Sequence, residues 1–297
     1  MREATADLFL DRTVASGAHQ KLIFTDLDGT LLDHHSYSHA EAESALQRLA
    51  ERGVPCLINS SKTAAEILPL HRQLGLDSPV IVENGSAIGI PPSCHHWPTD
   101  GLSQDPETGW HWASLGRDRW EILPILEDLQ RISGARFRGF SELGLKQIEA
   151  HTGLPPDAAA RANRRNYSEP LLWEDSTETL LHFTALAAER CLHAVRGGRF
   201  VQIIGAGADK GRALKWCANA YSSAYPATTI HCIALGDAPN DGAMLAAADI
   251  AVWVRSPVHT PGPEQGRLQT LHTTANGPAG WAEAIHQLLD QDEATHG

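Results

Sequence analysis

The sequence predicts an α/β fold: a Rossmann-like parallel-sheet core with an inserted second α/β domain. Short apolar runs alternate with amphipathic helical patterns over residues 21–90, a change in composition follows, and the alternation resumes at about residue 200. A strand–helix–strand order makes the strands parallel and places the helices over the sheet. The two alternating stretches are therefore expected to build one sheet, and the segment between them to fold separately.

The elements of the first stretch follow from the spacing of its apolar residues. The short apolar run at 21–25 predicts a strand, and the apolar residues within 42–49 fall on one helical face. The run at 54–58 predicts a second strand, 63–74 a second helix in spite of an internal proline, and 79–82 a third strand. This order is typical of a parallel sheet.

The inserted segment has a different composition. It begins with a stretch rich in Pro, Gly, His and Trp and continues with mixed patterns, among them an apolar run at Leu180–Phe183 that predicts a short strand. The first 20 residues show no sustained periodicity. We therefore expect a flexible extension over 1–20, a core built from 21–90 and 200–297, and an inserted domain over 91–199.

The alternating pattern returns after the insertion. Chemistry in parallel sheets collects at the carboxyl ends of the strands, so the residues that follow each strand are candidates for function. The expected elements are a strand at 200–204, a helix at 210–221, a strand at 230–235, a short helix at 240–248, a strand at 249–254 and, after a loop-rich stretch, a closing helix at 281–289.

Charge and composition disfavour several classes of protein. Acidic residues outnumber basic residues by 36 to 24, and the formal charge of −12 argues against nucleic acid or an anionic membrane as a partner. No apolar run approaches the roughly 18 residues that a membrane span needs. Five widely spaced cysteines without a Cys-x-x-Cys pair fit a reducing compartment, so a cytoplasmic protein is expected.

The first candidate site residues, Asp26 and Asp28, come directly after an apolar strand. Gly29 permits a backbone turn that lets both carboxylates approach one reacting centre. A calcium-binding loop is a poor alternative, because its glycine would stand at the sixth position, counted from Asp26, and here it stands at the fourth. A plain acidic turn stays open as a second alternative.

A second acidic group, Asp237 and Asp241, follows another apolar strand, with Asn240 beside it. Four carboxylates gathered at one sheet edge repel each other unless a cation neutralises them. Oxygen ligands favour Mg²⁺, which binds through a few carboxylates together with substrate phosphate. A capped helix start would also explain this second group. The predicted metal ligands are Asp26, Asp28, Asp237, Asn240 and Asp241.

Two further side chains suit a phosphate group. Lys210 stands at a predicted helix start after a strand, where its ammonium could balance phosphate and carboxylate charge. Ser60 follows another strand, and its hydroxyl together with the N–H groups of the next helix start forms a ready phosphate site. An exposed lysine and a simple helix cap by Ser60 or Ser61 are the alternatives. Glu83 also stands at a strand end.

These signals all lie at strand ends of one alternating pattern, and over residues 21–255 the sequence resembles the haloacid dehalogenase superfamily of phosphohydrolases. Its four motifs match, in chain order, Asp26 with Asp28, Ser60, Lys210, and Asp237 with Asp241. The insertion resembles the α/β cap of the superfamily's sugar-phosphatase branch. The resemblance implies that Asp26 attacks phosphorus to form an aspartyl-phosphate, that Asp28 acts as acid and base, and that Lys210 completes the catalytic set.

Within that branch the sequence is similar to the mannosyl-3-phosphoglycerate phosphatases. The similarity implies Mg²⁺-dependent hydrolysis of mannosyl-3-phosphoglycerate to mannosylglycerate and phosphate. A phosphatase for glucosyl-3-phosphoglycerate or another sugar phosphate, and a phosphomutase of the same superfamily, remain alternatives. The matching stretches are Ser60–Thr63 with Glu66, Glu83–Gly85, Phe137–Phe140, Thr152–Leu154, Arg165–Pro170 and Gly207–Gly211. The implied substrate and phosphate contacts are Ser60, Ser61, Lys62, Asn84, Arg165, which would pair with the glycerate carboxylate, and Glu169.

Overall fold

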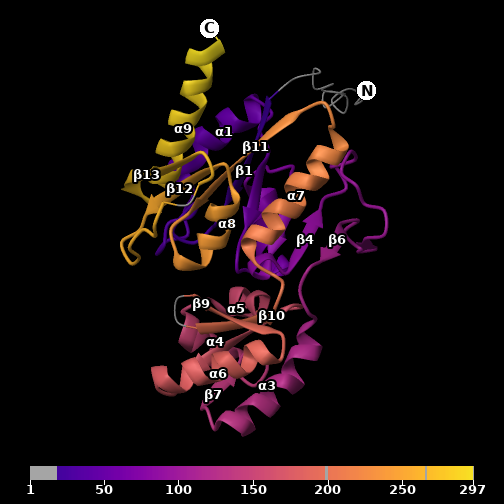
Figure 1. Ribbon diagram of the computed structural model, residues 1–297, viewed down its shortest axis with the longest axis vertical. Helices are drawn as coiled ribbons and strands as arrows, with labels where there is room; N and C mark the ends of the chain where they lie inside the picture. The colour runs from indigo at the N-terminus through magenta and orange to yellow at the C-terminus, as the bar shows by residue number, and fades with distance from the viewer. Residues whose placement is uncertain (1–18, 198–199, 265, 297) are drawn as a thin grey trace.

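The computed structural model of the chain describes residues 19–197, 200–264 and 266–296. Within them the chain forms a nine-stranded sheet, in the upper part of Figure 1, and a four-stranded sheet in the lower part. The strand order is β13-β12-β11-β1-β2-β3-β4-β6-β5 in the large sheet and β7-β8-β10-β9 in the small one. The predicted α/β class with a parallel-dominated sheet is confirmed.

The elements alternate along the chain as the apolar spacing predicts. The strands of the large sheet are β1 (His19–Thr25), β2 (Cys56–Asn59), β3 (Val80–Val82), β4 (Ala87–Ile90), β5 (Ser103–Gln104), β6 (His111–Ser114), β11 (Thr229–Gly236), β12 (Ile250–Arg255) and β13 (Gln269–Asn276). The small sheet contains β7 (Phe137–Gly139), β8 (Ser168–Trp173), β9 (Leu192–Gly197) and β10 (Phe200–Gly205). The α-helices are α1 (Glu43–Glu51), α2 (Ala64–Gln73), α3 (Arg119–Ser133), α4 (Leu145–Thr152), α5 (Pro156–Ala162), α6 (Thr177–Glu189), α7 (Lys210–Ala224), α8 (Gly242–Ala247) and α9 (Gly277–His296). Short 3₁₀ turns are η1 (Ala40–Ala42), η2 (Glu83–Gly85) and η3 (Pro239–Asp241).

The strands from β13 to β3 run parallel, and β1 lies between β11 and β2. Their register aligns Thr25 with both Ile58 and Leu235. The residues that follow these three strands therefore emerge at one edge of the sheet, although they are far apart in the sequence. This alignment positions the candidate site.

Helices cover both faces of the large sheet (Figure 1). On one face, α1, α2 and α9 pack against the strands through buried apolar residues such as Leu49, Ile67 and Trp281. On the other face, α7 and α8 pack through residues such as Leu214 and Leu245. The alternation of strand side chains between these two cores fixes which residues remain at the strand ends for chemistry.

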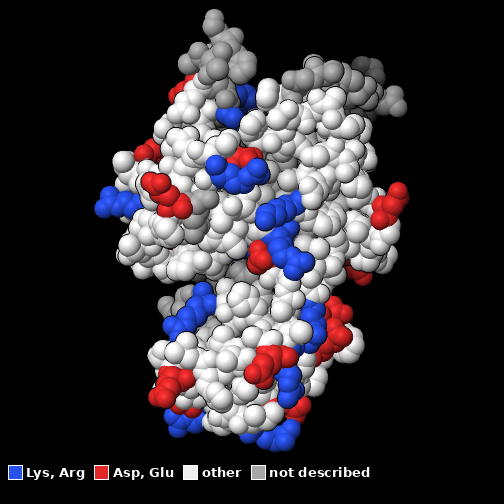
Figure 2. Space-filling model, in the orientation of Figure 1, with Lys and Arg blue, Asp and Glu red and all other residues white. Residues whose placement is uncertain are grey.

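The small sheet has an apolar core of its own. Leu171 and Ile203 from two of its strands pack against Ile122 of α3 and Phe183 of α6. A second small cluster, built around Phe140 and the helices α4 and α5, lies beside it. On the face of the molecule shown in Figure 2, acidic and basic side chains are interspersed over both parts.

The chain passes from the large sheet to the small sheet, and back, at other residues than the expected boundaries of the insertion. Residues 103–114 form two antiparallel strands that extend the large sheet beyond β4, so this Trp-rich stretch packs with the core. The strand at 200–205 pairs antiparallel with β8 and β9 and belongs to the small sheet, not to the parallel core. We therefore propose a division in which the inserted unit runs from about 116 to 205. Most of the expected extension over 1–20 lies outside the described residues.

Three local predictions also differ from the structure. Leu180–Phe183 was expected to be a strand but lies within α6, because its apolar residues continue a helical stripe with Ala187. The loop-rich stretch before the closing helix contains the additional strand β13. Thr63, and not Ser60 or Ser61, caps α2: its side chain accepts from the Glu66 N–H, and the Glu66 side chain accepts in return. Among the described residues, no helix combines the length and apolarity that a membrane crossing requires.

A buried histidine near the end of α2 gives the fold a dependence on pH. The ring Nε2 of His71 lies 2.9 Å from the Ser78 carbonyl oxygen, and burial lowers the pKa of His71 below its usual value of 6.5. The unfolded chain then takes up this proton at a higher pH than the folded chain, so stability should fall as the pH drops below 6.5. We expect His71→Leu to reduce the difference between the unfolding free energies at pH 7 and pH 5, measured with urea. The exposed control His95→Leu should leave that difference unchanged, and an unchanged difference in His71→Leu would contradict the prediction.

Candidate functional site

Three acidic side chains from different parts of the chain meet at the carboxyl edge of the large sheet. Asp26 follows β1, and Asp237 and Asp241 follow β11. One carboxylate oxygen of each lies within 4.8 Å of the others, and all three residues are buried. Gly29, with φ of +82°, brings its backbone so close that a Cβ atom there would lie 2.6 Å from an Asp237 oxygen. The predicted meeting of the two acidic groups is therefore present in the structure.

Lys210 forms the centre of this group. It is the first residue of α7, and its Nζ lies 2.6 Å from Asp26 Oδ1 and 2.6 Å from Asp241 Oδ1. Only 1% of the residue is exposed, so the ammonium is fully enclosed by its carboxylate partners and the protein. Gly85 makes this position possible, because a side chain there would collide with the backbone of Asp209 and Lys210. The predicted role of Lys210 near carboxylates, rather than on the surface, agrees with this geometry.

Burial and repulsion shift the titration of these groups. Burial raises the pKa of Asp26 well above its usual value of 3.8, and the other carboxylates add to the rise while the Lys210 ammonium opposes it. Burial and the Asp241 carboxylate also raise the pKa of Asp237. Burial disfavours the charged form of Lys210, but the Asp241 and Asp26 carboxylates outweigh it and keep its pKa above the usual value. Without a further cation the crowded, buried site therefore favours the protonated forms of Asp26 and Asp237.

The donor set fits a hard divalent cation. Three carboxylates against one ammonium leave an excess of two negative charges when all are ionised. Asp241 uses both oxygens within the protein: Oδ1 contacts Lys210, and Oδ2 accepts from the N–H groups of Asp237 and Ala238. Asp237 accepts from the Thr30 hydroxyl at 3.2 Å. Oxygen-only donors with this excess of charge are what Mg²⁺ requires, with Asp26 and Asp237 as the carboxylates able to bind it directly.

Asp28 lies beside this cluster. Its Oδ2 is 2.9 Å from the Nζ of Lys62, whereas its Oδ1 is buried and has no hydrogen-bond partner. Lys62 also lies 4.0 Å from Glu66 and over the ring of Tyr37, which fixes the ammonium in one place. One oxygen of Asp28 is thus held by Lys62, and the other is buried and unpaired in the structure.

A cavity of about 550 Å³ opens above the acidic edge. Residues of the large sheet line one side of it, and residues of the small sheet and of α4 with its following loop line the other. The predicted site residues among its lining are Asp26, Asp28, Ser61, Lys62, Asn84, Asp237 and Asn240. Sequence reasoning did not assign His34, His35, Tyr37, Val195, Phe200, Gln202 and His259, which also line it, and named Thr152–Leu154 only as a matching stretch.

Two predicted substrate contacts are placed differently. The Arg165 guanidinium donates to the carbonyl oxygens of Ala162 and Ser61 and to the Ser168 hydroxyl, so it supports the cavity wall from behind. Glu169 is fully buried, 2.6 Å from Arg119 Nε, and borders a separate cavity.

The strand register explains why Glu169 does not reach the predicted site. Glu169 pairs with Ile203, whose side chain belongs to the core of the small sheet. Glu169 is therefore on the face of β8 that points away from the acidic edge. Ser60, by contrast, stays at this edge as predicted: it is buried, and its carbonyl oxygen accepts from the Asn84 N–H.

Glu83, the other acid at a strand end, connects the two sheets. Its buried carboxylate accepts from the N–H groups of Asn166 at 2.9 Å and Tyr167 at 3.1 Å, and from the Ser168 hydroxyl at 2.5 Å. Its own N–H donates to the Lys62 carbonyl oxygen. In the sequence, the position of Glu83 after β3 marked it as a candidate for function. Its three partners lie 83 to 85 positions further along the chain.

The Glu83→Gln variant tests this connection. Gln presents an N–H₂ group where three donors converge, so at least one of them loses its acceptor, and we expect the free energy of unfolding to fall by about 2 kcal/mol. Urea unfolding of this variant beside the exposed control Glu178→Gln measures the loss. Equal stability of the two variants would show that the carboxylate is not needed between the sheets.

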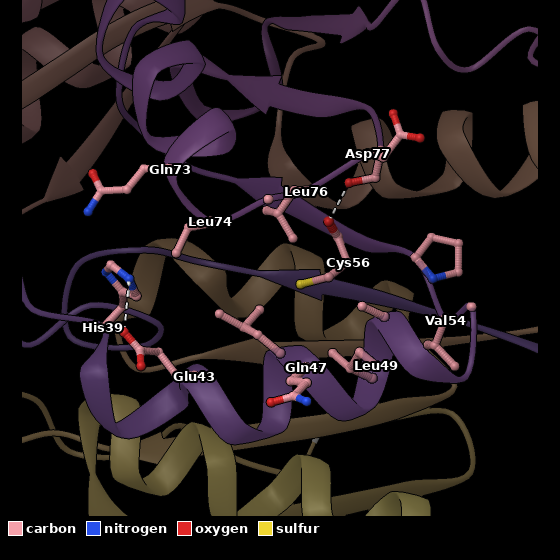
Figure 3. Close-up of a pocket in the computed structure, with 16 residues that line it drawn as sticks. His39, Glu43, Gln47, Leu49, Val54, Cys56, Gln73, Leu74, Leu76 and Asp77 are labelled. Carbon is pink, nitrogen blue, oxygen red and sulfur yellow. Dashed lines mark hydrogen bonds and ion pairs between the residues drawn. The ribbon is translucent and has the colours of Figure 1, made fainter. Parts of the chain in front are cut away.

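A second large cavity, of about 560 Å³, lies away from this site (Figure 3). Apolar side chains of α1 and of the chain after α2, among them Leu46, Leu49 and Leu74, provide much of its lining. In Figure 3 two of its polar lining residues, His39 and Glu43, point toward each other. None of the predicted site residues is among its described lining, so the acidic edge remains the candidate active site.

Comparison with known proteins supports this assignment. The chain matches the family of haloacid dehalogenase-like hydrolases over residues 23–99 and 174–258, which include all four strand-end motifs. A glucosyl-3-phosphoglycerate/mannosyl-3-phosphoglycerate phosphatase from Persephonella marina is 32% identical over 278 residues, covering 92% of this chain and 98% of the relative.

Solved structures agree on the fold. A haloacid dehalogenase-like hydrolase from Bacteroides thetaiotaomicron aligns with a TM-score of 0.58 at 18% identity, covering 91% of this chain and 99% of its own. A protein from Streptococcus mutans aligns with a TM-score of 0.61 at 20% identity, with coverage of 91% and 99%. The family match and the relative at 32% identity show that this chain belongs to the haloacid dehalogenase-like hydrolases and is an enzyme that hydrolyses phosphoric monoesters.

Proposed function

We propose that the chain is a Mg²⁺-dependent phosphatase that converts mannosyl-3-phosphoglycerate, or its glucosyl counterpart, to the glycosylglycerate and inorganic phosphate. The observation that carries the proposal is the contact of Lys210 with both Asp26 and Asp241, because it places a fixed positive charge beside a carboxylate at an open cavity. The relative from Persephonella marina, whose name gives both glycosyl phosphoglycerates, supports the substrate class.

Asp26 is the proposed nucleophile. Lys210 holds its Oδ1 at 2.6 Å, and the carboxylate borders the cavity. A carboxylate oxygen forms a bond to phosphorus while the bond from phosphorus to the glycerate oxygen breaks, which leaves an aspartyl-phosphate. Water then cleaves this intermediate and releases phosphate. Lys210 remains beside the reacting group and balances the charge on the phosphoryl oxygens.

Asp28 is the proposed acid and base. The residue lines the cavity, and its carboxyl group, whose Oδ1 has no hydrogen-bond partner, is proposed to protonate the departing glycerate oxygen and afterwards to accept a proton from the attacking water. Lys62, 2.9 Å from the other oxygen, keeps the carboxyl group in one orientation. Both proton transfers then occur at one position of the cavity.

The proposed metal ligands are the carboxylates of Asp26 and Asp237. Asn240 and the backbone carbonyl of Asp28, which are near these residues in the sequence, are proposed to complete the set. Bound Mg²⁺ would neutralise phosphate oxygens and offset the excess negative charge of the site. Asp241 keeps Lys210 and the loop after β11 in place through its two engaged oxygens. These roles use all four aspartates of the two acidic groups.

The rest of the substrate is proposed to occupy the cavity between the two sheets. Ser60 and Ser61 stand next to Lys62 in the loop after β2, where N–H groups and hydroxyls suit phosphate. Lys62, which lines the cavity, is the cation proposed for the glycerate carboxylate, and Arg165 holds this loop in place by donating to the Ser61 carbonyl oxygen. The wall from the small sheet then faces the sugar and keeps out water.

Phosphate release from mannosyl- and glucosyl-3-phosphoglycerate, 3-phosphoglycerate and hexose 6-phosphates, with Mg²⁺ and with EDTA, tests the proposal. We expect a glycosyl-3-phosphoglycerate to have the highest kcat/KM and EDTA to lower it by about 100-fold or more, since the metal stabilises charge in the transition state. Transfer of the phosphoryl group to another hydroxyl without free phosphate would show a phosphomutase instead.

A further inference from the structure

Gln202 is the polar side chain on a strand that is otherwise apolar. The strand β10 reads Phe-Val-Gln-Ile-Ile-Gly, and Val201 and Ile203 point into the core of the small sheet. Gln202 is on the opposite face, is partly buried, and lines the same cavity as Asp26. Its neighbours across the sheet, Pro170 and Val195, offer no polar side chain. An amide at this position therefore depends on partners from outside the small sheet.

That partner is Asn84, which lies in the turn η2 at the edge of the large sheet. Its Nδ2 donates to Gln202 Oε1 at 2.7 Å. Asn84 is only 3% exposed, and its Oδ1 is buried without a hydrogen-bond partner. The residue has φ of 58° and ψ of 39°, a left-handed conformation that asparagine tolerates better than most residues, in the turn next to Glu83. Asn84 lines the cavity, and its unpaired oxygen is thus held in a fixed place next to it.

One amide oxygen and one N–H₂ group take no part in the contact between the two side chains. Asn84 Oδ1 can accept a hydrogen bond, and the N–H₂ of Gln202 can donate one. Reversing both amides exchanges these roles but again leaves one amide oxygen and one N–H₂ group outside the contact. A hydroxyl group both donates and accepts, so it satisfies the two positions together. A phosphate or carboxylate oxygen would satisfy the donor alone.

We propose that Asn84 and Gln202 form a pair that recognises a sugar hydroxyl of the substrate and so selects phosphate esters with a glycosylated leaving group. The proposal rests on the phosphatase function above, because the cavity that holds the pair also holds Asp26 and Asp28. Neither side chain has a part in the proposed bond changes at phosphorus, so both are proposed as specificity determinants. The contact spans the two sheets, so it also requires the small sheet to lie where the structure places it.

The Gln202→Leu variant, which keeps the size of the side chain and removes its amide, tests the pair. The measured quantity is selectivity: kcat/KM for the best sugar-bearing ester of the panel divided by kcat/KM for p-nitrophenyl phosphate, which carries no hydroxyl. We expect it to fall about ten-fold, the effect of one hydrogen bond between uncharged groups. Because selectivity is a ratio, a general loss of folded enzyme does not change it. The exposed control Gln147→Leu on α4 should keep the wild-type ratio.

Two further comparisons sharpen the result. Among deoxy forms of the sugar ester, the form that lacks the recognised hydroxyl should have a kcat/KM about ten-fold below that of the full ester on wild-type enzyme. On Gln202→Leu the two esters should have the same kcat/KM. The double variant Asn84→Gly with Gln202→Leu should lose no more selectivity than the single variants, because the two amides act as one unit.

Each outcome separates the two proposals. An unchanged ratio in Gln202→Leu, or a wild-type enzyme that prefers p-nitrophenyl phosphate to every sugar ester, would overturn hydroxyl recognition. A wild-type enzyme that prefers another sugar phosphate to the glycosyl-3-phosphoglycerates would contradict the proposed substrate. The comparison between wild type and Gln202→Leu is then made on that preferred ester, where a loss of selectivity still supports the pair.

Discussion

Replacing Asp26 by Asn is expected to lower the rate of phosphate release by about 10⁴-fold or more, because the variant lacks the nucleophilic carboxylate. The side chain has nearly the same shape, and Lys210 keeps its second contact with Asp241 at 2.6 Å. The fold should therefore persist. In the absence of Mg²⁺ it should be at least as stable as wild type, since one of three repelling carboxylates is gone. Steady-state release of phosphate and urea unfolding measure the two effects.

The control for this variant is Asp100→Asn, an exposed aspartate outside the cavity lining. Its kinetic constants should equal those of wild type. An Asp26→Asn enzyme with near-wild-type turnover would refute the aspartyl-phosphate route. If the variant lost its fold along with its activity, variants of Lys210 and Asp28 would test the route instead.

Replacing Lys210 by Met should produce the largest loss of stability. The methionine fills a similar volume but leaves Asp26 and Asp241 buried without a counter-charge. Removing one partner of a buried ion pair lowers the free energy of unfolding by about 3–5 kcal/mol. Activity should be lost as well, since no fixed cation remains beside the transferred phosphoryl group. Urea unfolding in EDTA measures the stability, and added Mg²⁺ should restore part of it by neutralising the same carboxylates.

A matched control is Lys215→Met, an exposed lysine on the same helix, which should change the unfolding free energy by less than about 0.5 kcal/mol. Lys210→Arg keeps the charge but not the compact ammonium, so it should recover more stability than activity. If Lys210→Met were as stable as Lys215→Met, the enclosed ion pairs would not be what holds the strand ends together.

The core and its acidic edge were predictable because local signals agree there. Each of Asp26, Ser60 and Asp237 follows an apolar run, and alternation with helices makes neighbouring strands parallel. Parallel strands with aligned register must present their carboxyl ends together, so residues far apart in the sequence could be placed at one edge. The same alternation indicated which helices cover the sheet.

The contacts of the inserted unit could not be predicted in this way, because they depend on antiparallel register. A shift of one residue reverses the face of every side chain in a strand. Glu169 illustrates this: its motif suggested the substrate site, but its pairing with Ile203 turns it toward Arg119. Gln202, on the alternate face, reaches the cavity instead, and a glutamine in an otherwise apolar strand is the signal that could have identified it.

The short turn over Glu83–Gly85 is attached on both sides. Glu83 binds the backbone of 166–167 in the inserted unit, while its own N–H and that of Asn84 bind the carbonyl oxygens of Lys62 and Ser60. Any swing of the inserted unit away from the core must therefore either release these amides or drag the serine loop with it. The N–H groups of Asn166 and Tyr167 should consequently exchange with deuterium at the rate at which the enzyme opens to admit its substrate and discharge its products.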